Sequence, residues 1–110
     1  MTPNAVIWEQ TMDPQDIVEY KVECEPLLEV GESIDSFSLS LPAESTLFGL
    51  ELGTGAREAS LTGTVVTMWF SFDGTPVPSP VTLPIEITIV TDSIPSRTKQ
   101  RTLGLKVDQL

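Results

Sequence analysis

Residues 81–107 decide the fold of this chain, and they read VTLPIEITIVTDSIPSRTKQRTLGLKV. Two runs in which apolar and polar residues alternate, 85–91 and 103–107, flank a polar segment, which is the pattern of a β-hairpin. In each run the apolar side chains take every second position, so they share one face and can line a core. We therefore expect an all-β protein that closes with this hairpin.

The same alternation predicts further strands upstream, at residues 16–25, 36–41, 47–52 and 64–72. The last of these is rich in β-branched and aromatic residues, which makes it the best candidate for a central strand. In it, Val66, Met68 and Phe70 are expected to face inward, and Trp69 is expected on the opposite face.

Four prolines between residues 76 and 84 interrupt the pattern before the final hairpin. Because proline lacks a backbone N–H and has a fixed φ, residues 74–80 are expected to form an extended loop. Pro84, at the start of the next run, indicates a sheet edge or a bulge at that point.

The 110 residues suffice for one domain with one core. About six to seven strands, spaced near ten residues apart and with no window of helical period, predict an antiparallel β-sandwich with immunoglobulin-like character. We expect this domain to span residues 16–110, after an extended N-terminal arm over residues 1–15. The arm carries Ile7 and Trp8, which pack either on their own domain, as a first edge strand, or on another chain.

The composition argues against most enzyme classes. There is no histidine and a single cysteine, Cys24, so a zinc site, a haem site, a histidine triad or an internal disulfide cannot be built from this chain. Cys24 is expected to be a small buried hydrophobe. The acidic residues between 13 and 35 lack the spacing of a calcium loop, and a small sandwich seldom has a cleft for paired catalytic carboxylates. We expect no enzymatic activity, no metal and no cofactor.

The net charge of −10 disfavours nucleic acid as a partner. No apolar stretch has the length of a membrane helix, and the N-terminus lacks the features of a signal peptide, so we expect no membrane contact and synthesis in the cytoplasm. Residues 1–58 carry twelve acidic residues against Lys21 and Arg57, whereas residues 59–110 carry four charges of each sign. This acidic half either keeps the protein soluble or meets a basic patch on a neighbouring copy.

Two features suggest contact surfaces. Arg97, Lys99 and Arg101 alternate, so they form either a positive ladder that binds carboxylates on another protein or an edge strand protected by its charge. Trp69 is either an interface anchor covered by a neighbour or a residue packed within the domain. The candidate interface residues are Ile7, Trp8, Trp69, Arg97, Lys99 and Arg101.

Four segments carry a family resemblance: DIVEY at 16–20, LEVGESI at 28–34, VTMWFS at 66–71, and ITIVTDS at 87–93 with the residues that follow it, Arg97, Arg101, Leu103, Leu105 and Val107. In this pattern, from Asp13 onward, the chain resembles small immunoglobulin-like structural proteins in the virions of tailed bacteriophages. It departs from the pattern at DGTPVPSP, residues 73–80, where the group often has a glycine-rich turn. Residues 1–12 also lie outside the pattern.

The resemblance implies a virion component that decorates the outer capsid surface as a cement protein and binds the major capsid protein, after synthesis in the host cytoplasm. Because such sites lie on symmetry axes, it also implies a closed homo-oligomer, with a trimer favoured. Two alternatives remain open: a head–tail adaptor or tail component of the virion, and a carbohydrate- or cell-surface-binding module. The second alternative needs an exposed aromatic platform, for which only Trp8, Tyr20 and Trp69 are candidates.

Overall fold

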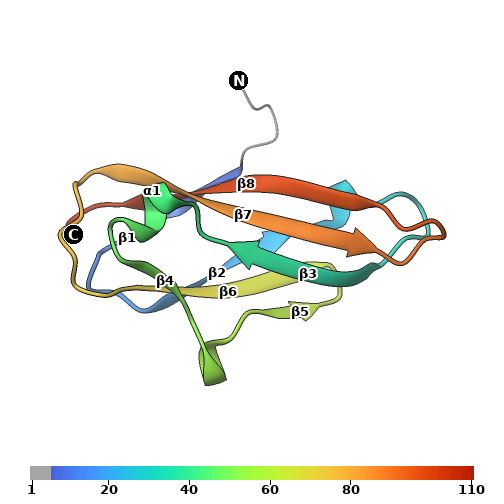
Figure 1. Cartoon of the computed structure of the whole chain (residues 1–110), viewed down its shortest axis with the longest axis horizontal. Helices are drawn as coiled ribbons and strands as arrows, with labels where there is room; N and C mark the ends of the chain where they lie inside the picture. Colours follow the sequence, from blue (N-terminus) through green and yellow to red (C-terminus); the bar gives the residue numbers. More distant parts are fainter. Residues whose placement is uncertain (1–5) are drawn as a thin grey trace.

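The computed structural model describes residues 6–110 and consists of two β-sheets packed face to face (Figure 1). One sheet has the strand order β1-β8-β7-β3, and the other has the order β2-β6-β4, with β5 also paired to β6. The strands are β1 (Val6–Met12), β2 (Val18–Glu23), β3 (Ile34–Ser40), β4 (Leu50–Leu52), β5 (Ser60–Thr62), β6 (Val65–Phe72), β7 (Val81–Thr91) and β8 (Thr98–Val107). Short helical turns are η1 (Glu25–Leu27), α1 (Ala43–Thr46) and η2 (Gly55–Arg57).

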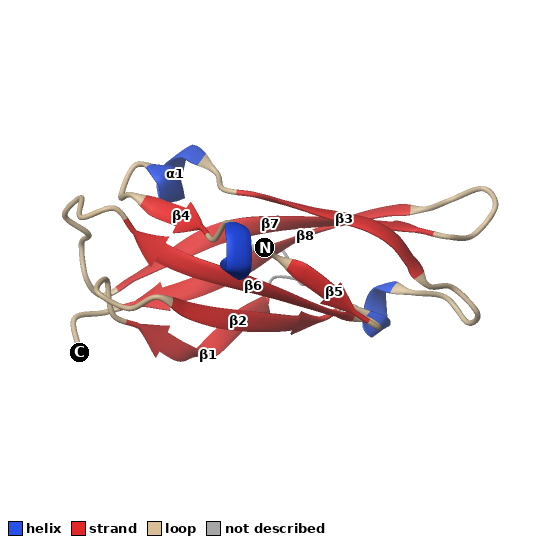
Figure 2. Ribbon diagram, turned by 90° about the horizontal axis from the view of Figure 1, so that it is seen from below, coloured by secondary structure: helices blue, strands red, loops and turns tan. Residues whose placement is uncertain are grey.

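The expected terminal hairpin is confirmed. β7 and β8 pair as antiparallel neighbours from Val81 opposite Val107 to Val90 opposite Thr98, without a break in register. β6 is the central strand of the second sheet, as expected, because β2 pairs along one of its edges and β4 and β5 follow each other along the other edge (Figure 2). The all-β sandwich predicted from the alternation is therefore present.

The core lies between the two sheets and is built from alternate residues of their strands. Each fully buried side chain of this kind contributes about 1.5–3 kcal/mol of hydrophobic free energy, against the entropy lost on ordering the chain. Cys24 is buried, as expected. The buried apolar residues are Met12, Tyr20, Cys24, Leu50, Val66, Met68, Phe70, Leu83, Ile85, Ile87, Ile89, Leu103, Leu105 and Val107.

Residues 6–12, assigned from the sequence to an N-terminal arm, form the edge strand β1. β1 pairs with β8 in parallel, so the sandwich is mostly rather than wholly antiparallel. Of the two alternatives for this part of the arm, packing on its own domain is the one that the structure shows.

The side of the sandwich where edge strands β1 and β2 meet is closed by two aromatic residues. The Trp8 indole N–H donates a hydrogen bond to the Lys21 carbonyl on β2 (2.8 Å), and the Tyr20 hydroxyl donates to the Gln10 carbonyl on β1 (3.1 Å). Each ring thus packs in the core while its polar atom binds a carbonyl of the opposite edge strand.

One local prediction was wrong. The strand expected over 47–52 is reduced to Leu50–Leu52, because residues 43–46 form the single helical turn α1 and residues 47–49 turn the chain.

Pro84 lies inside β7, which is an interior strand of its sheet over most of its length. At Pro84, however, the sheet has an edge, as the proline indicated, because β3 pairs with β7 only as far as Glu86 and no strand lies beside Pro84 on that side.

Ser45 of α1 occupies the place that β3 leaves free. Its hydroxyl is fully buried and donates a hydrogen bond to the Pro84 carbonyl at 2.6 Å. A buried carbonyl without a hydrogen-bond partner costs about 1–3 kcal/mol. The Ser45 hydroxyl gives the Pro84 carbonyl of β7 its partner and also attaches α1 to the sheet.

We expect Ser45→Ala to lower the free energy of unfolding by about 1–3 kcal/mol, because the Pro84 carbonyl loses its buried donor. Urea denaturation followed by tryptophan fluorescence measures the change. Ser40→Ala, at an exposed serine of β3, is the matched control and should change stability by less than about 0.5 kcal/mol. Equal effects of the two substitutions would show that the Ser45 hydrogen bond is not important for the fold.

Candidate functional site: surfaces on the two outer sheet faces

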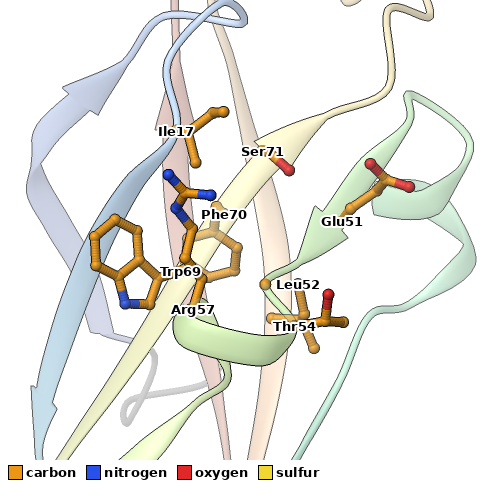
Figure 3. A pocket seen from close by; sticks show the side chains of 9 residues that line it. Ile17, Glu51, Leu52, Thr54, Arg57, Trp69, Phe70 and Ser71 are labelled. Carbon is orange, nitrogen blue, oxygen red and sulfur yellow. The ribbon is translucent and has the colours of Figure 1, made fainter.

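Trp69 lies on the outer face of β6, on the opposite face from the core residues Met68 and Phe70, and is partly exposed. The guanidinium carbon of Arg57 lies 5.6 Å from the centre of its ring, within range of a cation–π interaction. Ile17, which is 53% exposed, lies beside them (Figure 3). An aromatic ring, an arginine and an isoleucine therefore share one surface, which we call the Trp69 surface.

 

Gly53 allows the backbone to pass close enough to β6 for Arg57 to contact Trp69. A Cβ atom at this position would lie 2.3 Å from the Arg57 carbonyl oxygen and 2.9 Å from the Trp69 Cβ, so only glycine fits. The Gly53 N–H also donates to the Trp69 carbonyl (2.9 Å). This close approach lets η2 fold back beside β6 and places Arg57 over the indole.

The Trp69 surface includes a shallow depression of about 260 Å³, lined by Ile17, Leu52, Arg57 and Trp69 together with the polar residues Glu51, Thr54 and Ser71 (Figure 3). Aromatic residues and arginine are the commonest anchors of protein–protein interfaces. Trp69 was a candidate from the sequence, whereas Arg57 and Ile17 were not. Arg57 had only one signal in the sequence, as one of two basic residues in the acidic half of the chain.

Ile7 lies on the outer face of the other sheet and is 57% exposed. It packs over Gly104, where an added Cβ would come within 3.0 Å of the Ile7 side chain. A second shallow depression, of about 320 Å³, is lined here by Ile7, Pro84, Gly104 and their polar neighbours. We call this the Ile7 surface, and it lies on the opposite side of the sandwich from the Trp69 surface.

Trp8, in contrast, packs against its own domain. Its ring centre lies 4.9 Å from that of Tyr20 and 5.9 Å from that of Phe70, and its N–H is bound to β2. The side chain is only partly exposed, so most of its contacts are within the chain.

Arg97 forms an internal ion pair. Its guanidinium binds both carboxylate oxygens of Glu32, with Nε–Oε2 at 3.0 Å and Nη2–Oε1 at 2.7 Å, and its Nη1 lies 3.5 Å from Glu29. Glu32 also accepts hydrogen bonds from the Ser93 hydroxyl and the Glu29 N–H, both at 2.7 Å. The β7–β8 turn is thereby attached to the loop before β3, and the two lie side by side at one end of the molecule (Figure 1).

This ion pair holds the pKa of Glu32 far below its ordinary value of 4.5, chiefly through the hydrogen bonds from Arg97 and then through those from Glu29 and Ser93. The pKa of Arg97 is raised in turn, chiefly by Glu32. Both groups therefore remain charged at neutral pH.

Lys99 and Arg101 lie on β8 opposite Ile89 and Ile87, which are core residues. The register thus places them on the inward face of the hairpin, continuing the row of Leu103 and Leu105 toward its tip. Both are partly exposed, and neither forms a salt bridge among residues 6–110. Whether they bind another protein stays a prediction.

The described residues offer little chemistry of another kind. Within residues 6–110, no group of three or more His, Cys, Asp or Glu side chains is arranged to hold a metal ion. In the same part of the chain no helix is long and apolar enough to cross a membrane. Searches against protein-family models, curated proteins and solved structures found no match to this chain.

The Arg97–Glu32 pair predicts a specific pH dependence of stability. A carboxylate whose pKa is lowered by folding stabilises the protein above its unfolded pKa and loses that contribution as the pH falls below about 4.5. We expect Glu32→Gln to be less stable than the wild type at pH 7 and to lose less stability between pH 6 and pH 3, as measured by urea unfolding.

Glu44→Gln is the control, because Glu44 is exposed and forms no salt bridge among the described residues. Its pH profile should follow that of the wild type. If Glu32→Gln gave the same profile as well, the Glu32 carboxylate would not contribute to stability as the geometry indicates.

Proposed function

We propose that this protein is a structural component of a phage virion that binds the outer surface of the capsid as a decoration protein. One observation carries the proposal: the Trp69 surface and the Ile7 surface lie on the two opposite outer faces of one small sandwich. A protein with a contact surface on each side can bridge two neighbouring subunits, which is the task of a cement protein. The family resemblance of residues 13–107 supports the same conclusion.

The strand order supports an immunoglobulin-like fold. If β2, β3, β4, β6, β7 and β8 correspond to strands B to G, the sheets are B-E-D and C-F-G, as in immunoglobulin constant domains. The first strand differs, because β1 pairs with β8 and not with β2. The B–F disulfide of antibody domains is also missing, since Cys24 is the only cysteine.

Binding would rest on apolar anchoring and charge complementarity. Ile17 and Trp69 supply apolar area on one face, and Arg57 supplies a positive charge beside them. Lys99 and Arg101, which form no salt bridge within the described residues, would meet carboxylates of the major capsid protein. A closed homo-oligomer would add avidity to these single contacts and make attachment more durable.

A head–tail adaptor or tail component is the second candidate. It is favoured by the uneven charge of the chain, because subunits of a ring contact each other through two different surfaces, which can be an acidic and a basic one. The copy number distinguishes the two roles. Quantitative mass spectrometry of purified particles should give hundreds of copies for a decoration protein and about six or twelve for a ring component.

The Trp69 surface predicts a defect in attachment. We expect Trp69→Ala to reduce the occupancy of purified capsids at least tenfold, because removal of a central aromatic anchor costs about 2 kcal/mol or more of binding free energy. Capsids lacking the protein are incubated with each variant, and bound protein is quantified after sedimentation.

Val65→Ala is the matched control, since Val65 lies on the same outer face of β6 near its other end. It should bind like the wild type, and the circular dichroism of both variants should be unchanged. Full occupancy by Trp69→Ala would remove the Trp69 surface from the proposal, and absence of the wild-type protein from particles would end it. Binding to glycans that is lost in Trp69→Ala would instead favour the carbohydrate-binding alternative.

A further inference from the structure

The strand β3 is a long edge strand whose outer side is not paired. It pairs only with β7, and it is the last strand of its sheet. At the other edge of the sandwich, β1 and β2 are closed by Trp8 and Tyr20, and the edge strands β4 and β5 have three residues each. β3, with seven residues, is therefore the edge at which another strand can add most readily.

The hydrogen bonds around β7 show which residues of β3 have their backbone groups directed outward. The Thr91 N–H binds the Arg97 carbonyl (2.9 Å), so the odd-numbered residues of β7 bind β8 and the even-numbered ones bind β3. Thr88 lies opposite Ser38, which therefore uses its N–H and C=O within the sheet. Its neighbours Phe37 and Leu39 direct theirs to the free edge.

β3 lacks the usual protection of an edge strand. Its segment from Ser36 to Ser40 contains no charged residue and no proline, and the register shift between Ile34 and Ser36 lies at its beginning. Phe37 and Leu39 pack against the core on the inner face but remain partly exposed, and the three serines on the outer face are exposed.

We propose that β3 pairs with β3 of a second copy of this chain, in antiparallel orientation about a two-fold axis at Ser38. In this register Phe37 of each copy lies opposite Leu39 of the other, so the outward N–H and C=O groups form hydrogen-bonded pairs. The half-exposed phenyl and isobutyl groups cover each other, and Ser38 lies opposite Ser38. The two four-stranded sheets become one continuous sheet of twice the width.

The edge of β3 suits a second copy of this chain because the segment from Ser36 to Ser40 has no charged residue. Each chain carries a net charge of −10, so most of its surface repels another copy. The strip from Ser36 to Ser40 brings no acidic side chain to the contact, and the proposed register places Asp35 of each copy opposite Leu41 of the other, at opposite ends of the pair. The outer face of β2, in contrast, carries three charged residues, Glu19, Lys21 and Glu23.

The test is the mass in solution of the wild type and of Ser38→Lys, measured by sedimentation equilibrium over a range of protein concentrations. The wild type should approach twice the chain mass of 12.0 kDa as concentration rises. Ser38→Lys should sediment at the chain mass, because two ammonium groups would meet at the two-fold axis. Added salt should strengthen wild-type association by screening the acidic surfaces.

Gln100→Lys is the matched control. Gln100 is exposed on the same face of the same sheet and lies in one row with Ser38 and Thr88, but two strands away from the edge. It changes the net charge equally and should leave the dimer intact. As an independent readout, hydrogen exchange at the amides of Phe37 and Leu39 should slow with increasing concentration of the wild type and not of Ser38→Lys.

A wild type that stays at the chain mass at all concentrations would overturn the proposal. So would a trimer, or any other oligomer, whose mass is the same in Ser38→Lys. Because capsid attachment is assigned to other surfaces, Ser38→Lys can lose the dimer and still bind particles, so this contact and the proposed function fail separately.

Discussion

The burial of one face of each sheet against the other is the interaction on which the rest of the structure depends. Val66, Met68 and Phe70 of β6 are fully buried against the isoleucines and leucines of β7 and β8. Because side chains alternate along a strand, burying these residues fixes the outward direction of their neighbours, Trp69 among them. The packed core leaves contact chemistry to the outer faces, the edges and the ends of the sandwich.

Polar groups at the margins of the core each have a hydrogen-bond or ion-pair partner. Ser45 binds the Pro84 carbonyl where β3 has ended, Trp8 and Tyr20 bind carbonyls of the edge strands, and Arg97 is paired with Glu32 at the tip of the hairpin. Among the described residues, no buried side-chain nitrogen or oxygen lacks a hydrogen-bond partner. These contacts close three parts of the margin, and β3 is the long edge that remains open.

Period-two alternation was sufficient to predict the terminal hairpin and the inward set of β6, because both follow from local sequence. The parallel pairing of β1 could not be predicted in the same way, since a strand's partner depends on the tertiary fold. Pro84 indicated the local sheet edge, but the tertiary fold decides that β3 is the strand that ends beside it. The helical turn α1 was missed because one turn has no detectable period. Arg97 pairs with a residue 65 positions away, and Arg57 reaches Trp69 only through the turn at Gly53, so neither contact has a local signal.

The proposed adhesive role depends on where the contact surfaces lie. In that proposal, anchors on opposite faces let one copy hold two neighbours, and the open edge of β3 lets copies join each other. The most direct test is a cryo-electron microscopy reconstruction of purified particles. We expect a two-layered β density, matching a domain of 45 × 35 × 22 Å, on the capsid exterior between adjacent capsid subunits. Particles with no such density, or with the chain enclosed inside the shell, would contradict it.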